Sequence, residues 1–503
     1  MLDQKRVLLL SSTVLIVLSS VGVLGHFLPL KLLEQYYDLE SKLFEHFEFH
    51  VKEQKSLLNI LKTRYKNHRR ARTNVTDVES YVGNPLNMLS LMRRMTADWP
   101  VTLALLNRSD SVKERFLPSV EEYVNAVNSI NKLQQVYQIE MKDLGSGVVF
   151  KDTHKSSRLT ESDYFHIGQH LYTMGWYTDA LRWLKMALIS EPEGEAQRKG
   201  GNHPSEQLLE HLALASCFAG DQEESVHYFQ ELYYTYPEFR PSKDLVDHHI
   251  TTLNQSCETL ARHSRSSRIT NEMIPNLNME EDKQLTEQYQ ATCRRSWHPN
   301  ESILNCYLYS SKSHLLLRPL KVEKLHLDPP ISMIHDFLPA KEREHFISIA
   351  MTKVEPHRYG GLVSRWWEHL KQLGKEGKKL IQRAADIISL KLHNSLLITN
   401  LPVAADDYLV HHVAIGEDQK SFENRKASLT IYLEEPNEGG TLVFPRLNLS
   451  VTPTRGAAVL WYNMHPDGQV DLRSIHGHCP ILSGNAWTLT LWLGGKPENS
   501  LQS

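Results

Sequence analysis

Six short β-rich segments, separated by turn sequences, restrict the fold of this chain more than any other feature. The interruptions include Pro-Asn-Glu-Gly-Gly at 436–440 and Pro-Asp-Gly at 466–468. Evenly spaced strands of this kind are typical of an all-β sandwich or jelly roll. Helical stretches near 340–352 and 362–393 precede all six segments, so we expect a jelly roll with helical support over residues 326–496. The segments are Leu396–Thr399, Tyr408–Ala414, Ala427–Leu433, Gly440–Phe444, Ala457–Tyr462 and Trp487–Trp492.

The first part of the chain has a helical pattern instead. From Leu30 to about Ile139 the apolar residues recur at helical spacing, with strong breaks only at Gly83-Asn84-Pro85 and Trp99-Pro100. We expect a helical domain over residues 26–155. Its first stretch is long and rich in charges, which suits a coiled-coil contact between two chains and equally well a face that packs on its own domain.

Residues 160–238 predict two pairs of helices. The expected helices are 162–174, 176–190, 204–218 and 222–236, with small residues where helices cross and a proline after each second helix. The spacing resembles a tetratricopeptide unit, which we place at 156–240. Two pairs are few for a solenoid, so we expect them to pack against neighbouring elements. The predicted fold class is therefore multidomain: two helical domains followed by a jelly-roll domain with helices.

Composition limits the function classes. The 503 residues carry 56 basic and 59 acidic side chains, a formal charge of −3. This balance argues against nucleic-acid binding, which needs a basic face. The five cysteines include no CxxC pair, which argues against a zinc ribbon and a thioredoxin-type redox motif.

The N-terminus predicts entry into the secretory pathway. Lys5 and Arg6 precede an uncharged run from Val7 to Gly25, which we interpret as a signal peptide at 1–25; a signal anchor is the alternative, because about 19 apolar residues can also span a bilayer. The last five residues are no KDEL-type signal, so residence in the endoplasmic reticulum would need a retained partner. Sequons for N-glycosylation occur at Asn74, Asn107, Asn254, Asn300 and Asn448.

The polar, irregular stretch 241–325 is predicted to be a linker. Cys293 and Cys306 lie thirteen residues apart within it. In an oxidising compartment a local disulfide is the expected fate of such a pair.

Three separate stretches resemble the α subunit of procollagen prolyl 4-hydroxylase, in chain order. The first, 81–87 running into 93–99, resembles that family's dimerising N-terminal domain. The second, from 159–163 through Tyr172, Tyr177 and Trp183, is similar to its peptide-binding domain. The third comprises 439–445, 456–463, 476–480 and 484–487.

The resemblance implies a double-stranded β-helix dioxygenase that uses Fe(II), 2-oxoglutarate, O₂ and ascorbate to hydroxylate peptidyl proline in collagen-like chains. It also implies pairing with protein disulfide isomerase as β subunit in the endoplasmic reticulum lumen, and a dimer of α subunits. The family's second disulfide joins the cysteine after the distal His to a C-terminal cysteine that this sequence lacks, so we expect Cys479 to be unpaired.

The metal site is incomplete. Such oxygenases hold Fe(II) with two histidines and one carboxylate, and an H-x-D tripeptide on a strand supplies two of these ligands because residues i and i+2 share a face. The matching tripeptide here has His411 first and Val413 in the Asp position, and the distal histidine is His476. Val413 has no lone pair to donate. Glu417 and Asp418 are near in sequence, without a defined reach to the metal.

The cosubstrate site departs from the family as well. The lysine that pairs with the distal carboxylate of 2-oxoglutarate corresponds to Ala486, and the family's Tyr-Gly pair reads Leu401-Pro402. An unpaired carboxylate buried there would be unfavourable by several kcal/mol. Arg425, Arg446 and Arg473 are the candidates to replace the lysine from another strand.

The peptide-binding segment matches the family more closely than the metal and cosubstrate positions do. Tyr172 and Tyr177 match family tyrosines, with Thr178 and Trp176 where a second Tyr and an Asp are usual. Polyproline helices dock on aromatic grooves, so these rings are candidates to bind a proline-rich or collagen-like polypeptide. The alternative is that both rings belong to the packed core.

Two hypotheses follow for the function. The chain is either a non-hydroxylating relative that binds proline-rich partners or subunits, or a working hydroxylase with a rebuilt site. A carboxylate from Glu417, Asp418 or Asp471 close to His411 and His476, with a cation near Ala486, would favour the second. A third possibility, a purely structural scaffold, would leave the tyrosine groove filled.

Overall fold

The computed structural model describes residues 30–70, 72, 75, 77–106, 117–149, 158–190, 205–236, 279–295, 305–352, 364–388, 390, 392–404, 407–410 and 425–494. The chain divides into two compact units, Met1–Asn74 and Val75–Ser503. The predicted signal peptide, His411, Val413, Glu417, Asp418 and the first four sequons lie outside the described residues. No helix in the ranges given combines the length and apolar content of a membrane span.

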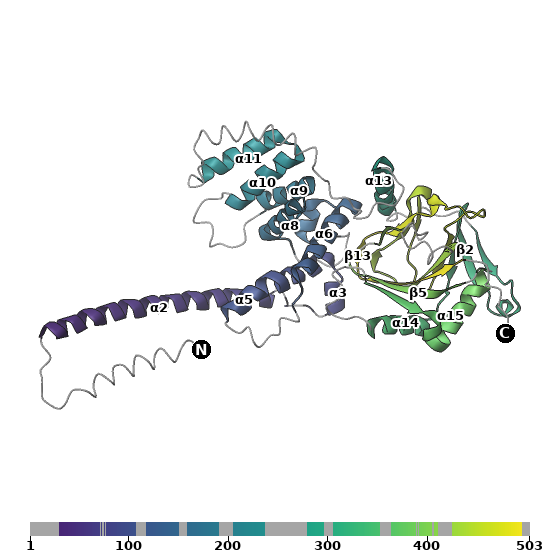
Figure 1. Cartoon of the computed structure of the whole chain (residues 1–503), viewed down its shortest axis with the longest axis horizontal. Helices are drawn as coiled ribbons and strands as arrows, with labels where there is room; N and C mark the ends of the chain where they lie inside the picture. Colours follow the sequence, from purple (N-terminus) through teal and green to yellow (C-terminus); the bar gives the residue numbers. More distant parts are fainter. Residues whose placement is uncertain are drawn as a thin grey trace, which may run out of the picture. The chain divides into compact units, whose positions relative to one another are not determined.

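The first unit consists, where described, of the single helix α2 (Leu30–Arg70), drawn in purple in Figure 1. Basic residues fill its last turn, which suits the negative C-terminal end of the helix dipole. Several of its large apolar side chains are exposed, including Tyr37, Phe44 and Phe47. The predicted helix is confirmed, whereas a coiled-coil contact through it stays a prediction.

The second unit begins with short helices around one longer helix. These are α3 (Val78–Val82), α4 (Pro85–Arg93), the π-helical turn η1 (Arg94–Asp98), α5 (Trp99–Leu105), α6 (Val120–Tyr137) and α7 (Met141–Ser146). Asn84 caps α4 by accepting hydrogen bonds from the backbone of Leu86 and Asn87, and Pro85 starts the helix. Trp99-Pro100, expected to break the helical run, instead forms the first turn of α5.

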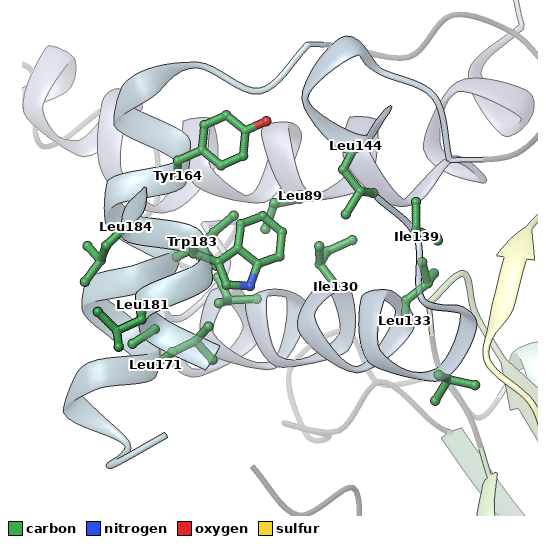
Figure 2. Packing of buried hydrophobic residues seen from close by; sticks show 14 of the residues in the cluster. Leu89, Ile130, Leu133, Ile139, Leu144, Tyr164, Leu171, Leu181, Trp183 and Leu184 are labelled. Carbon is green, nitrogen blue, oxygen red and sulfur yellow. The ribbon is translucent and has the colours of Figure 1, made fainter. Parts of the chain in front are cut away.

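Two helix pairs follow, within a residue or two of the predicted bounds: α8 (Glu161–Thr173), α9 (Tyr177–Ile189), α10 (Glu206–Ala219) and α11 (Gln222–Thr235). Gly168 lets α8 and α9 cross closely, because a Cβ there would lie 2.6 Å from Cγ of Leu184. Figure 2 shows Trp183 of α9 in the core beside Ile130 of α6. Its indole N–H donates to Asn131 of α6 at 2.9 Å, so the pairs pack on a neighbouring element as expected.

The C-terminal part is built on antiparallel sheets. The largest has eight strands in the order β1-β2-β3-β11-β7-β14-β5-β4, and the second has four in the order β10-β9-β12-β6, while β13 and β8 pair separately. The strands are β1 (Cys306–Tyr309), β2 (Leu320–Leu327), β3 (Pro330–His335), β4 (Ser364–His369), β5 (Leu392–Leu401), β6 (Asp407–Val410), β7 (Ala427–Glu434), β8 (Glu438–Gly439), β9 (Leu442–Phe444), β10 (Leu449–Val451), β11 (Ala458–Tyr462), β12 (His476–His478), β13 (Ile481–Ser483) and β14 (Ala486–Leu493).

Two expectations were wrong in this part. The stretch 241–325 is not a plain linker, because it contains helix α13 (Met279–Arg295) and the strands β1 and β2. The helical stretch 362–393 includes β4, the turn η6 (Leu370–Leu373) and the start of β5 as well as helix α15 (Gly374–Ile387). β1 and β4 are the two edge strands of the large sheet. Their own sequences predict a strand only weakly, and each forms one because it pairs with its single neighbouring strand.

The two faces of the large sheet have different chemistry. Leu429, Ile431, Leu489 and Leu491 belong to the apolar core that α14 (Ala340–Thr352) and α15 help to form. Figure 1 shows both helices beside the sheet. The alternate residues of β7 and β14 face the other side, where polar side chains are buried. These are Ser428, Thr430, Thr488 and Thr490.

The disulfide expectation was wrong. Cys293 is bonded to Cys479, with 5.7 Å between the Cα atoms, and Cys306 is free and exposed. The reason is the helical face of α13: Leu285, Tyr289 and Cys293 recur every fourth residue and are all buried. Cys306 lies on edge strand β1, outside this core. Cys217 is also disulfide-bonded.

Candidate functional site

His476, the predicted distal histidine, is buried and one of its ring nitrogens is hydrogen-bonded to the backbone. It starts β12, opposite Val410 of β6, and is almost fully buried beside the rings of Trp461 and Phe444, 4.6 and 5.6 Å away between centroids. Its Nδ1 lies 2.8 Å from the carbonyl oxygen of Ser474, which can only accept a hydrogen bond. The bond assigns the proton to Nδ1, the tautomer in which Nε2 carries the lone pair.

The described carboxylate nearest in sequence to His476 is otherwise engaged. Asp471 accepts hydrogen bonds from Nε and Nη2 of Arg473 at 2.9 and 2.8 Å. Burial acts to raise the pKa of Asp471, but the hydrogen bonds from Arg473 outweigh it and leave the pKa below its usual value. Within the described ranges, no three His, Cys, Asp or Glu side chains come together as a metal site. His411, the other predicted histidine ligand, lies outside these ranges.

The position expected for the 2-oxoglutarate lysine is apolar. Ala486 is 1% exposed and forms a small buried cluster with Leu401 and Ile481. Leu401 is its direct partner across the β14–β5 ladder. A carboxylate placed here would contact aliphatic groups and lose its hydration without gaining a hydrogen bond or a cation in return. This position therefore does not fit 2-oxoglutarate.

Two of the three arginines considered as substitutes have other roles. The guanidinium of Arg425 lies 3.9 Å over the ring of Trp492, and burial lowers its pKa to about 10. Trp492 is six residues from Ala486 along β14, roughly 20 Å at the rise of a strand. Arg473 binds Asp471 and Asp328. Arg446 lies in η7 (Pro445–Leu447), the turn after β9.

Polar side chains on the face of the large sheet opposite the apolar core form hydrogen bonds with one another and with Asn463. The hydroxyls of Thr430 and Thr490 are 3.0 Å apart. Asn463 accepts from the indole of Trp461 at 3.0 Å and donates to the hydroxyl of Ser428 at 2.9 Å. This network was not predicted from the sequence, although Thr and Ser at alternate positions of β7 and β14 were a signal for it.

An aromatic cluster lies on the helix pairs. We use this name for five half-buried side chains from α8, α9 and α10: Phe165, Tyr172, Tyr177, His211 and Phe218. Ring centroids of Tyr172 and Tyr177 are 5.5 Å apart, and Tyr177 lies 4.7 Å from Phe218. The predicted pair Tyr172 and Tyr177 is therefore brought together, with part of each ring open to solvent.

Three members of the aromatic cluster, Phe165, His211 and Phe218, were not predicted from the sequence. The signal was their spacing, since Phe165 and Tyr172 are seven residues apart on α8, and His211 and Phe218 are seven apart on α10. Two turns of helix place each pair on one face.

His211 of α10 contacts α8 within the aromatic cluster. Its ring lies 5.5 Å from Phe165 and 5.4 Å from Tyr172, both edge-on. Its Nδ1 is 2.7 Å from the carbonyl of Gln207, and Nε2 is 3.4 Å from Gln169 of α8. Burial, followed by the proximity of Tyr177, raises the pKa of Tyr172, so its hydroxyl stays protonated at neutral pH.

Three further predicted positions are not members of the aromatic cluster. Trp176 caps α9 and packs on the helical core, while Thr178 is exposed. Asn448 is exposed in a left-handed turn and its side-chain oxygen accepts a hydrogen bond from Arg295. Its glycosylation stays a prediction.

Comparison with known proteins gives two family matches. Residues 30–151 match the model of the prolyl 4-hydroxylase α subunit, N-terminal region, and residues 399–494 match the 2OG-Fe(II) oxygenase superfamily. The second match contains both His476 and Ala486.

Curated relatives match over most of their length. Human prolyl 4-hydroxylase subunit alpha-3 is 26% identical over 466 residues, covering 83% of each chain. The alpha-2 subunit of Caenorhabditis elegans is 26% identical over 476 residues, covering 86% of this chain and 84% of that one. A solved structure, the collagen prolyl hydroxylase of Paramecium bursaria Chlorella virus-1 with 2OG, is 19% identical and covers 33% of this chain and 96% of its own, with a TM-score of 0.28.

Proposed function

Since this chain belongs to the family of prolyl 4-hydroxylase α subunits, we propose that it is a non-hydroxylating member that binds proline-rich polypeptides. The aromatic cluster is the observation that carries the binding function. The apolar surroundings of Ala486 support the loss of hydroxylation.

The case against catalysis depends on two separate positions. Cosubstrate binding needs a cation where Ala486 contacts Leu401 and Ile481. Iron binding needs an anionic ligand, and Val413 replaces the aspartate that the family uses. The nearby Asp471 is held by Arg473 instead. Because each change removes a different interaction, repairing one leaves the other defect in place.

The case for peptide binding is geometric. Tyr172, Tyr177 and Phe218 offer adjoining ring faces and edges, each partly open to solvent. A polyproline II helix is already extended and costs little entropy to order, and its rings pack on aromatic surfaces. Contacts with a few rings give an affinity in the micromolar to millimolar range, about −4 to −8 kcal/mol.

The proposal includes a location and partners. We place the protein in the endoplasmic reticulum lumen, with protein disulfide isomerase as β subunit and with a second α subunit, because its relatives are themselves named as subunits. In such an assembly the aromatic cluster would bind a proline-rich or collagen-like segment next to the second α subunit and protein disulfide isomerase.

The alternative is a hydroxylase with a rebuilt site. One observation favours it: the bond from Nδ1 of His476 to Ser474 leaves the tautomer that a metal requires. Under the proposal, this histidine is a remnant of the ancestral site.

Cosubstrate turnover in air by the whole chain co-expressed with protein disulfide isomerase separates the two functions. The assay supplies Fe(II), ascorbate and a collagen-like peptide and measures succinate, with an active α subunit as positive control. We expect no succinate above background, while titration with nonaproline still gives binding heat. Peptide-dependent succinate that disappears in His476→Ala would establish the alternative instead.

A further inference from the structure

A basic cavity lies on the jelly-roll part, apart from the positions discussed above. Its volume is about 620 Å³, within the usual range for small-ligand sites. Five of its lining side chains are cations and two are carboxylates, Asp336 and Asp386. The cations are Arg318, Lys321, Arg343, Arg383 and Arg455.

Several elements meet around the basic cavity. Arg318 precedes β2, and Asp336 directly follows β3 in a left-handed conformation. Arg343 belongs to the first turn of α14 and Arg383 to α15, while Arg455 and Gly456 form the turn before β11. Segments far apart in the sequence therefore contribute the charges, so the fold and not a local basic run creates the site.

Most of these cations have an acidic partner. Lys321 binds Asp336 at 2.6 Å, Arg383 binds Glu342 at 2.7 Å and Arg455 binds Glu434 at 2.6 Å. Of these acids only Asp336 lines the cavity. Glu342 and Glu434 hold the guanidinium groups of Arg383 and Arg455 in place from outside the lining.

Two arginines retain binding capacity. Arg318 is exposed and forms no ion pair within the described ranges. The Nε–H of Arg343 is buried and has no hydrogen-bond acceptor among the described residues. Nη1 of the same side chain donates to the carbonyl of Leu433 at 2.7 Å and lies 4.0 Å from the carboxylate of Glu434. A buried donor without an acceptor is unfavourable by about 1–3 kcal/mol, so such donors are usually satisfied by water or a ligand.

Gly456 keeps space beside this donor. A Cβ at this position would lie 3.5 Å from Nε of Arg343 and 2.9 Å from the carbonyl oxygen of Leu338. The residue has φ +79°, a conformation that favours glycine.

From these features we propose that the basic cavity binds a small polyanion with two or more phosphate, sulfate or carboxylate groups. Four of the five cations are arginines, whose planar forks bind such oxyanions in pairs of hydrogen bonds. A concave site of this volume suits a compact molecule better than an extended acidic chain.

Calorimetric titration of the whole chain with pyrophosphate and with citrate, in 20 mM NaCl, tests the proposal. We expect saturable binding of at least one of them with a dissociation constant below 1 mM, weakened several-fold in 200 mM NaCl because charges dominate the contact. Comparison of the two probes tells a phosphate-type ligand from a carboxylate.

Charge reversal at the exposed Arg318 is the matched variant. Arg318→Glu should weaken binding at least tenfold, whereas Lys142→Glu, an exposed reversal on α7, should leave it unchanged; thermal unfolding checks that both variants fold. Arg343→Lys keeps the charge but removes Nε–H and should also weaken binding. No binding of either probe at 10 mM, or equal effects of Arg318→Glu and Lys142→Glu, would overturn the proposal.

Discussion

Ala486 lies directly opposite Leu401 in the β14–β5 ladder, and Ile481 completes their contact. A lysine-carboxylate pair needs a polar surrounding, but both neighbours here are aliphatic. The change at residue 486 is therefore accompanied by surroundings that no longer suit a charge.

We expect Ala486→Lys to lower the free energy of unfolding by about 2–4 kcal/mol, because an ammonium group would be buried without a counterion. Urea unfolding measures the change. Leu327→Lys, an exposed position in the same part of the chain, serves as control and should alter stability by less than about 0.5 kcal/mol. Equal stability of the two variants would contradict the apolar description of this site.

The same substitution should not restore turnover. Val413→Asp or Ala486→Lys alone is expected to give no succinate, and the pair at most a partial recovery, since Leu401 and Pro402 also differ from the family. Misplaced cosubstrate alone lowers rates by orders of magnitude. Full activity from either single change would show that the two defects are not independent.

Peptide binding should depend on Tyr177. Its ring contacts both Tyr172 and Phe218, so Tyr177→Ala should weaken nonaproline binding at least fivefold in calorimetry. Tyr234→Ala changes an exposed tyrosine of α11 outside the aromatic cluster and provides the matched control. An unchanged dissociation constant in Tyr177→Ala would reject the aromatic cluster as the binding surface.

The bond between Cys293 and Cys479 should be essential for stability. Removing a native disulfide typically lowers the free energy of unfolding by about 2–5 kcal/mol, so Cys479→Ser should unfold at clearly lower denaturant concentration. Cys306→Ser, which changes a free and exposed cysteine, should behave like the parent protein. Non-reducing peptide mapping that recovers a Cys293–Cys306 peptide would instead support the pairing expected from sequence distance.

Stability should fall in acid through Asp471. The pKa of its carboxyl is lowered in the folded state, so the stabilisation is complete above the unfolded pKa of about 4 and is lost as pH falls through the folded pKa. Asp471→Asn should therefore be less stable than the parent protein at pH 7, and the difference should shrink at pH 3. Asp467→Asn, an exposed neighbour, should show no such trend.

Local patterns predicted the helices and the central strands well. The four helices from α8 to α11 end within one or two residues of their expected bounds, because capping residues such as Thr160 and Asp163 can be recognised in the sequence. Strands β7, β11 and β14 were recognised because both of their faces are buried and rich in β-branched or aromatic residues.

Relationships between distant residues were beyond such patterns. Sequence distance favoured Cys306 as the partner of Cys293, whereas the buried face of α13 turns Cys293 toward Cys479, 186 residues away. In the same way, Phe165 and His211 join the aromatic cluster only because α8 and α10 approach one another. The family resemblance indicated which site residues had changed, and the fold shows what surrounds Ala486.

The helical part holds the segment between His476 and Ala486 at several points. Tyr289 donates to the carbonyl of His478 at 2.8 Å, Tyr137 to that of Pro480 at 2.7 Å, and the N–H of Gly484 to the carbonyl of Gly83 at 2.9 Å. A fragment that begins at Pro330 would lack Gly83, Tyr137 and Tyr289, which make these hydrogen bonds. It would also lack Cys293, the disulfide partner of Cys479. The C-terminal sheet-rich part of this chain is therefore not an independent module, and exchanging it with that of a relative would also require exchanging Gly83, Tyr137 and α13.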